Sequence, residues 1–212
     1  MSKKFRNIIT ALYVVALLTL VTGATYAYFT MIRVARFSPK VSVGTATLNY
    51  IFFDSGNPIG IYPNTENFQE GMDNLSSETF ASAYLRHEKG DTTSSIKYNL
   101  YLNVDSNTLT YSTTEKKPEL ILEIKDDKGN EITKIENLEY VSVVDGKGKT
   151  IKGFDITTAL GRYDILKERV LETETEKLEK WNAKVTYVNL SESQDNNLEK
   201  ELKGYIRIEK AD

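Results

Sequence analysis

The chain has 212 residues, of which 40% are hydrophobic and 27% are charged, a balance typical of a globular protein. Its formal net charge of -3 excludes the basic footprint that nucleic-acid binding needs, so we expect no nucleic-acid partner. Cysteine is absent, which excludes disulfide bonds and thiolate metal ligands. The sequence therefore predicts a folded domain of ordinary size that is held together by its core alone.

The first part of the chain predicts export. Lys3, Lys4 and Arg6 precede a run from Ile8 to Ile32 that contains no charged side chain. A basic start, an apolar stretch and small residues before a cleavage position are the features of an export signal. The remainder is therefore expected to be extracellular or on the cell surface.

Two interpretations of this segment compete. In the first, residues 1–27 are removed, with Thr25 and Ala27 as the small residues before the cut and Tyr28 as the new first residue. In the second, the run remains as a membrane anchor that extends to about residue 32, since roughly 20 apolar residues span a bilayer as a helix. The membrane is a partner during export in the first case and a permanent one in the second.

Period-two alternation dominates the rest of the chain and predicts β-strands that each bury one face. In Ile96–Val104, the even positions are apolar and are expected to be buried, while neighbours such as Lys97 and Asn99 are expected to be exposed. The same reasoning predicts burial of Leu120, Leu122, Ile124, Val185, Tyr187, Ile206 and Ile208, and exposure of Glu123 and Arg207. The expected strands lie, in chain order, in Val41–Phe53 with a bulge at Gly44, Ile96–Val104, Leu120–Ile124 paired with a strand from Ile132, Tyr140–Val144, Trp181–Leu190 and Gly204–Glu209.

Three other segments complete this chain-order prediction. Asn57–Asp73 is expected to be the longest surface loop, and Ser76–Arg86 is interpreted as a short helix capped by Ser76 or Ser77. Tyr163–Lys180 fits a helix or a strand, and the two remain open. The fold class predicted is mainly β, an antiparallel jelly-roll-like β-sandwich with one or two short helices, preceded by an N-terminal signal or transmembrane helix. The predicted organisation is an export signal at 1–27, an N-terminal strand or linker at 28–39 and a sandwich at 40–212.

The sequence contains no complete histidine, serine-triad or phosphate-loop motif for catalysis. His87 is the only histidine, so a two-histidine zinc site is impossible and a serine triad would need this same residue. The Asp145–Thr150 stretch resembles a phosphate loop but has Val143 where the first glycine should stand, and a hairpin turn is the favoured interpretation. Asp126–Glu131 has oxygens that suit calcium, yet a turn is favoured there too.

Glu172, Glu174, Glu176 and Glu179 form an acidic cluster, which is interpreted as a solvated face. A carboxylate pair for glycoside chemistry stays open, although nothing in the sequence singles one out. We therefore expect no enzyme activity, no metal and no cofactor.

The segment that follows the predicted cut is unusually apolar and has no obvious local partner. In an extended chain, Tyr28, Thr30, Ile32 and Val34 point one way, and Phe29, Met31, Arg33 and Ala35 point the other. Such a segment can add to the open edge of another sheet. The sequence thus predicts a self-association strand whose main contacts come from Tyr28, Phe29, Met31, Ile32 and Val34.

The motif Gly23-Ala24-Thr25-Tyr26-Ala27-Tyr28-Phe29 resembles the export signal of the TasA/camelysin family of Firmicutes surface and biofilm-matrix proteins. Gly44–Leu48 is similar to the glycine before the first core strand of that family, and residues 181–208 resemble its last two strands. The resemblance implies processing by a SipW-type signal peptidase, a jelly-roll fold and fibre assembly by donation of the freed N-terminal strand. It brings no catalytic residue, and the chain lacks the ligands for a camelysin-type metalloprotease activity.

The leading functional hypothesis is a cell-surface structural protein of biofilm-matrix or fibre type that associates with itself or with other surface proteins. The alternative is a membrane-anchored extracellular adhesion or carbohydrate-binding β-sandwich, and an extracellular hydrolase is a third, less favoured hypothesis. The start of the mature chain discriminates between the first two.

Overall fold

The computed structural model describes residues 50–86 and 94–211, which lie in one of two compact units of the chain, Lys40–Asp212. The described residues are mainly β, and every strand pair among them is antiparallel. The elements are β1 (Tyr50–Ser55), β2 (Ile59–Ile61), β3 (Leu75–Arg86), β4 (Ser94–Asn107), β5 (Leu120–Asp126), β6 (Tyr140–Val144), β7 (Thr150–Asp155), β8 (Gly161–Thr173), β9 (Glu176–Tyr187), the 3-10 turn η1 (Asp195–Asn197) and β10 (Leu202–Lys210).

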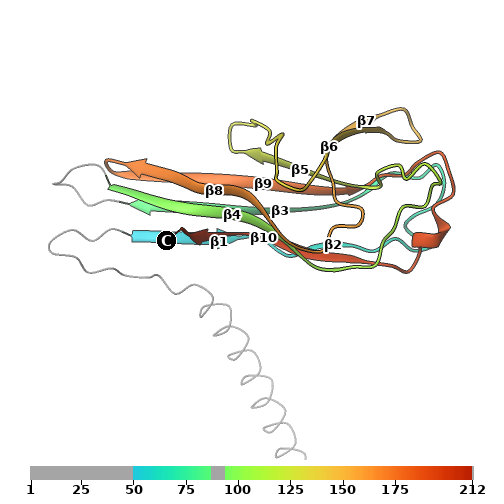
Figure 1. Cartoon of the computed structure of the whole chain (residues 1–212), viewed down its shortest axis with the longest axis horizontal. Coiled ribbons are helices and arrows are strands. Elements are labelled where there is room, and N and C mark those ends of the chain that lie inside the picture. Colours follow the sequence, from blue (N-terminus) through green and yellow to red (C-terminus); the bar gives the residue numbers. More distant parts are fainter. Residues whose placement is uncertain (1–49, 87–93, 212) are drawn as a thin grey trace, which may run out of the picture. The chain divides into compact units, whose positions relative to one another are not determined.

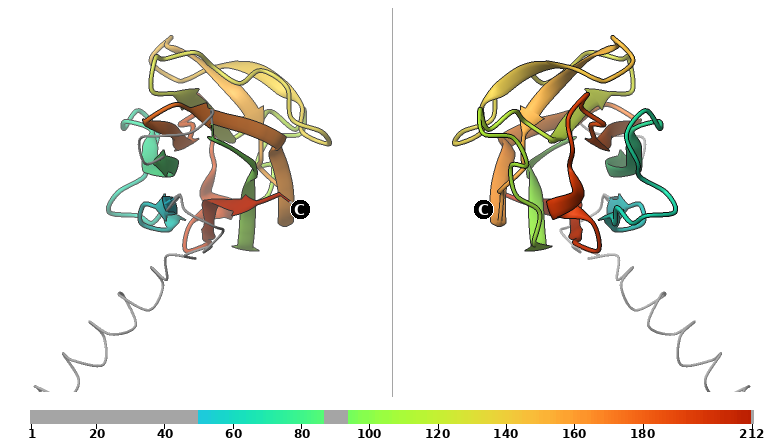
Figure 2. Two further views of the ribbon diagram at one scale, coloured as in Figure 1. Left: turned by 90° about the vertical axis from the view of Figure 1, so that its left-hand side faces the viewer. Right: turned by 90° about the vertical axis from the view of Figure 1, so that its right-hand side faces the viewer.

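These strands form two sheets packed as a β-sandwich (Figure 1). The six-stranded sheet has the order β1-β3-β9-β5-β7-β6, and the four-stranded sheet has the order β2-β10-β4-β8. The end views in Figure 2 show β6 and β7 beyond the rest of their sheet, at the edge opposite β1. Strands far apart in sequence are therefore neighbours, as with β3 and β9.

The main core fills the space between the sheets and follows the predicted alternation. Ile96, Tyr98, Leu100 and Leu102 of β4 are all buried, as are the other seven positions for which burial was predicted. Lys97 and Arg207 are exposed, but Asn99 and Glu123 are half-buried and not exposed as expected. The burial of these residues thus confirms the inward face that the period-two pattern predicted for each of these strands.

A second, smaller core is a feature that the alternation did not predict. Ile121 alternates with the buried Leu120 and Leu122 and so lies on the other face of the strand, yet it is 1% exposed and packs with Val143, Val188 and Leu190. Val143 of β6 and the chain after β9 pack against Ile121, so the second face of β5 is buried at this end of the strand. The predicted strand Trp181–Leu190 ends at Tyr187, and Val188 and Leu190 beyond it belong to this second core.

The helix interpretation of Ser76–Arg86 was wrong, because this segment is most of β3. It pairs with β1 on one side and with β9 on the other, and small Ala81 and Ala83 face the core. In this segment, pairing with two neighbouring strands outweighs the local propensity for helix. The only helical element among the described residues is the three-residue η1.

The ambiguous segment Tyr163–Lys180 is strand, divided between β8 and β9. Two further predictions needed correction. The turn after β5 forms, but the expected strand from Ile132 is reduced to an isolated bridge between Lys125 and Glu131. The presumed loop Asn57–Asp73 contains β2, and its Ile59, Ile61 and Phe68 are buried in the main core.

Candidate functional site

The residues that the sequence assigned to processing and self-association lie outside the described part of the chain, and so does His87. They are Thr25, Ala27, Tyr28, Phe29, Met31, Ile32 and Val34. Within 50–86 and 94–211, no helix is both long and apolar enough to cross a membrane. The assignments of export, cleavage and anchoring therefore stay predictions.

The glycine-rich stretch Asp145–Thr150 forms the hairpin turn between β6 and β7, as favoured over a phosphate loop. The Asp145 carboxylate accepts backbone N–H groups of Lys147 at 3.0 Å and Lys149 at 2.8 Å, and the Asn74 amide at 2.8 Å. Burial alone would raise the pKa of Asp145, but these hydrogen bonds hold it below its usual value. The hydrogen bonds of the Asp145 carboxylate therefore stabilise its own turn and do not form a ligand site.

The turn after β5 is built in the same way. Asp126 accepts backbone N–H groups of Lys128 at 2.9 Å and Asn130 at 2.7 Å, and the Asn130 side-chain amide at 2.8 Å. The Asn130 side chain lowers the pKa of Asp126 against the opposing effect of desolvation. Among the described residues, no group of three or more His, Cys, Asp or Glu side chains is placed to hold a metal ion.

Two members of the acidic cluster, Glu176 and Glu179, have different partners. Glu176 accepts the Tyr84 hydroxyl at 2.9 Å, whereas Glu179 accepts the Tyr98 hydroxyl at 2.5 Å and pairs with Arg169 at 3.2 Å. Residues three apart on β9 point to opposite faces of the sheet. The two carboxylates therefore cannot flank one bond of a substrate.

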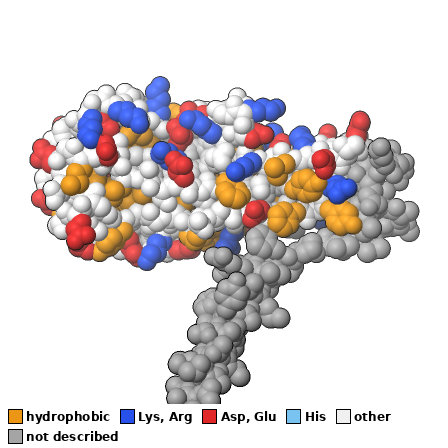
Figure 3. Space-filling model, turned by 180° about the vertical axis from the view of Figure 1, so that it is seen from behind, with side chains coloured by type: hydrophobic (Ala, Val, Ile, Leu, Met, Phe, Trp, Pro, Cys, Tyr) orange, Lys and Arg blue, Asp and Glu red, His pale blue; other side chains and the backbone are white. Residues whose placement is uncertain are grey.

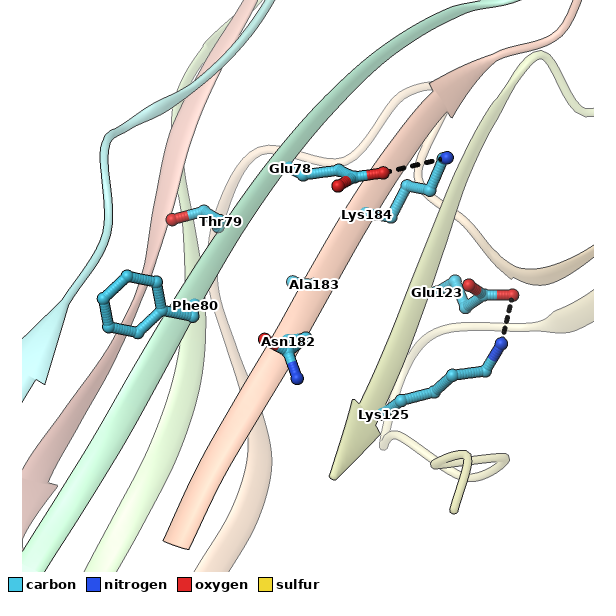
Figure 4. A pocket seen from close by; sticks show the side chains of 8 residues that line it. All are labelled: Glu78, Thr79, Phe80, Glu123, Lys125, Asn182, Ala183 and Lys184. Carbon is cyan, nitrogen blue, oxygen red and sulfur yellow. Dashed lines mark ion pairs between the residues drawn. The ribbon is translucent and has the colours of Figure 1, made fainter. Parts of the chain in front are cut away.

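A shallow hollow of about 370 Å³ lies on the outer face of β3, β9 and β5 (Figure 4). Its charged side chains form two ion pairs, Glu78 with Lys184 at 2.9 Å and Glu123 with Lys125 at 3.1 Å. The Phe80 ring also borders the hollow. The Lys180 ammonium lies over this ring, 4.4 Å from its centroid, in a cation–π contact. The charges balance, and the residues lining it include no nucleophile held by a base.

A buried polar network surrounds Glu119, which is 0% exposed. Its carboxylate accepts hydrogen bonds from the Ser112 hydroxyl at 3.0 Å, Tyr187 at 3.0 Å, Gln194 at 2.7 Å and Asn197 at 3.0 Å, and also from the Ser112 backbone N–H. These donors come from the chain before β5, the end of β9 and η1. The network fixes three connecting segments and is structural in role, because its donors are used within the fold.

The sheet edges differ in how well they are protected against further pairing. The edge strand β2 has three residues and lies between Pro58 and Pro63. Strand β8 carries register shifts against β4, and Glu168 has a positive φ of 50°. Strand β6 has only five residues. Prolines, bulges, charges and short length are the usual devices that block edge-to-edge association.

Strand β1 has six residues, with no proline and no register shift against β3. It is paired with β3 on one side and with no other described strand. Its first four residues, Tyr50–Phe53, are all apolar, and Asp54 is its single charge. We call this side of β1 the open edge.

Apolar side chains also continue from the open edge across the outer face of the six-stranded sheet. The register places Phe52 opposite Tyr84 and Tyr84 opposite Leu178, which is 53% exposed. Tyr50, 40% exposed, flanks this row on β1. Figure 3 shows hydrophobic side chains gathered over the end of this face where β1 begins. We call Phe52, Tyr84 and Leu178 the outer apolar row.

Comparison of the chain with protein-family models, with curated proteins and with solved structures finds no match. The candidate site is therefore defined by geometry alone, and the open edge with its outer apolar row is the feature best suited to binding. Sequence reasoning missed this row because its residues are far apart in the chain. The sequence signal for this row was Leu178, which is the single apolar residue in the polar stretch Glu172–Lys180.

Proposed function

We propose that this protein is an exported cell-surface structural subunit, of the biofilm-matrix or fibre type, that self-associates by donation of an N-terminal strand. The open edge at β1 carries the proposal, because it is the sheet edge with the longest uninterrupted apolar sequence and the least protection among the described strands. An edge of this kind either pairs with another strand or promotes aggregation.

The donor in this proposal is Tyr28–Phe37, which becomes N-terminal once residues 1–27 are removed. The segment is apolar over most of its length, and backbone hydrogen bonds to an edge strand supply affinity while side chains supply register. The jelly-roll topology expected from the TasA/camelysin resemblance belongs to the same proposal, as does processing by a SipW-type peptidase. Two antiparallel sheets around one main core are consistent with it.

Light scattering tests the proposal on two chains, one that starts at Tyr28 and one that starts at Ser38. The longer chain is expected to form oligomers whose mass grows with concentration and time, while the shorter chain remains monomeric. A third chain that starts at Tyr28 and carries Ile32→Asp serves as control, because a charge within the donor disfavours burial. Equal monomer content in all three chains would contradict strand donation and favour the anchored adhesion domain.

A further inference from the structure

The buried network around Glu119 holds a hydroxyl group and an amide group against the same carboxylate oxygen. The Ser112 hydroxyl and the Asn197 side-chain nitrogen each lie 3.0 Å from Oε2 of Glu119. The hydroxyl oxygen and the amide nitrogen are 3.1 Å from each other. A nucleophile, a base and a nitrogen that could leave are therefore all within hydrogen-bonding distance of one another, which is the arrangement that acyl transfer to a hydroxyl requires.

The amide of Asn197 has more acceptors around its nitrogen than it has hydrogens. Besides Ser112 and Glu119, the backbone carbonyl oxygen of Thr110 lies 2.6 Å from this nitrogen. A side-chain amide carries two N–H groups, and the two shorter contacts, to Thr110 and Glu119, use both of them. The Ser112 oxygen is thus held against the amide group with its lone pairs unused by that group.

The oxygen of the same amide faces hydrogen-bond donors. Oδ1 of Asn197 accepts the backbone N–H of Thr110 at 3.0 Å and lies 3.4 Å from the Thr110 hydroxyl. Donors in this position stabilise the negative charge that develops on a carbonyl oxygen when a nucleophile adds to its carbon. Glu119 and Asn197 are both 0% exposed, so water has little access to the reacting groups.

We propose that Ser112 and Asn197 form an intramolecular ester bond in the folded protein, with Glu119 as the base. Glu119 takes the hydroxyl proton while Oγ of Ser112 bonds to the side-chain carbonyl carbon of Asn197. The carbon–nitrogen bond of the amide then breaks, and Glu119 returns the proton to the nitrogen, which leaves as ammonia. The reaction needs no oxidant or further reactant, and in the structure both side chains are unreacted.

The neighbouring Asn196 is less well placed for this reaction. Its side-chain oxygen accepts the Ser112 hydroxyl at 2.6 Å, but the residue is exposed. A hydroxyl has one hydrogen, so Ser112 cannot donate to Glu119 while it donates to Asn196. The contact with Asn196 therefore belongs to the resting arrangement, and Asn197 is the residue that shares the base with Ser112.

Such a bond would give this cysteine-free chain a covalent cross-link. It would join the chain before β5 to η1, which precedes β10, across a separation of 85 residues. A cross-link between distant residues stabilises a fold mainly by restricting the unfolded chain.

Mass spectrometry of the full chain tests the proposal directly. Trypsin cuts after lysine, so Ser112 is expected in the peptide Tyr98–Lys116 and Asn197 in the peptide Val185–Lys200. We expect these two peptides to be recovered joined, with a mass lower than their sum by one ammonia. Mild alkali should separate them by hydrolysis and leave an aspartate at position 197. Recovery of both peptides free and at full mass would overturn the proposal.

Matched variants test the nucleophile, the amide and the base separately. Ser112→Ala lacks the hydroxyl, and Asn197→Asp has no ammonia to release, so both are expected to give free peptides. Asn196→Asp is the matched control for the amide and should still give the joined pair. Glu119→Gln keeps the size of the side chain but not its basicity, and should form several-fold less of the joined pair over the same time.

Three outcomes would contradict particular parts of the proposal. Loss of ammonia without joined peptides, retained in Ser112→Ala, would indicate a cyclic imide at an asparagine and overturn the ester. Joined peptides in Asn197→Asp but not in Asn196→Asp would overturn the assignment of the amide. Equal amounts of the joined pair in Glu119→Gln and in the natural chain would overturn the role of the base. The decisive measurement is made on the natural chain, so a variant that does not fold leaves the test intact.

Discussion

The hydroxyl of Tyr98 on β4 donates a 2.5 Å hydrogen bond to the carboxylate of Glu179 on β9, and so links the two sheets through the core. The same hydroxyl accepts the indole N–H of Trp181 at 3.0 Å, and Arg169 on β8 pairs with Glu179. Tyr98 is 0% exposed, and burial is the main cause that raises the pKa of its hydroxyl above the usual value. The hydroxyl therefore remains a neutral donor at neutral pH.

Tyr98→Phe is expected to lower the free energy of unfolding by about 1–3 kcal/mol, because the Trp181 N–H loses its acceptor and Glu179 loses a donor inside the fold. Urea denaturation measures the change. Tyr205→Phe is the matched control, since Tyr205 is half-buried and its hydroxyl makes no hydrogen bond to the described residues. The control should stay within about 0.5 kcal/mol of the natural protein. Equal stability of both variants would show that the link between the sheets contributes nothing.

Glu179 should make stability depend on pH at the acidic end. Burial alone would raise its pKa, but hydrogen bonds from Arg169 and Tyr98 hold the pKa below its usual value. A carboxyl whose pKa is lower in the folded state stabilises the protein above its unfolded-state pKa of about 4.3, and this stabilisation is lost as the pH falls through the folded-state pKa. The urea midpoint, followed from about pH 7 down to about pH 3, should fall less steeply in Glu179→Gln than in the natural protein. Parallel curves would contradict this role.

Leu100→Ala is expected to cost roughly 2–5 kcal/mol, because Leu100 is fully buried between the sheets and its removal leaves a cavity. Leu160→Ala serves as control at a position that is 63% exposed. The difference in denaturation midpoint between the two variants checks the prediction, and a midpoint that Leu100→Ala leaves unchanged would count against the sandwich core.

Gly153 on β7 is expected to tolerate no side chain. A Cβ there would lie 2.4 Å from the carbonyl oxygen of Leu122, and the backbone φ is +154°. Gly153→Ala should therefore destabilise the protein by roughly 1–3 kcal/mol or more, since the neighbouring strand must move. Gly60→Ala is the control, because no atom lies within 4 Å of a Cβ at that position. Thermal unfolding of the two variants should differ clearly, and equal midpoints would show that β7 can shift freely.

Glu119→Gln is expected to destabilise the protein by about 1–3 kcal/mol, because the new amide nitrogen is a donor that faces other donors. Tyr187, Gln194 and Asn197 all donate to one oxygen of Glu119, Oε2, and the Ser112 backbone N–H donates to the other, Oε1, so the new amide nitrogen meets a donor at either position. Glu192→Gln, which changes an exposed carboxylate, should cost at most about 1 kcal/mol. A Glu119→Gln variant as stable as this control would indicate that the network is not needed as an acceptor centre.

Intact mass spectrometry of the surface-associated protein should give a chain that begins at Tyr28. The physical basis is the small pair Thr25 and Ala27 after an apolar run. A mass that still includes Met1 would favour the uncleaved anchor. Ala27→Leu should leave a larger fraction of the chain unprocessed, since a large residue does not fit the small-residue position before the cut.

Period-two alternation predicted the buried residues correctly where only one face of a strand is buried. It placed the inward residues of β4 and β10 correctly, because a shift of one residue would expose the whole set. It failed at Ile121, where other segments cover the second face of the sheet, and at β3, whose conformation depends on partners about a hundred residues away.

The polar network could not be predicted for a related reason. Its donors Ser112, Tyr187 and Gln194 converge on Glu119 only after the strands have paired. No local spacing in the sequence marks such an arrangement, whereas the turns at Asp126 and Asp145 were predicted because their hydrogen bonds stay within a few residues.

The position of β10 has a consequence for when the protein can fold. This last strand lies inside the four-stranded sheet, between β2 and β4, which are roughly a hundred residues or more earlier in the chain. Folding that depends on such distant contacts is slow, because the chain must close long loops before the contacts reward it. A chain that emerges from its N-terminus cannot complete either the four-stranded sheet or the main core until β10 has been synthesised. The order of the strands thus delays completion of the fold until more than a hundred residues after β2 have been made.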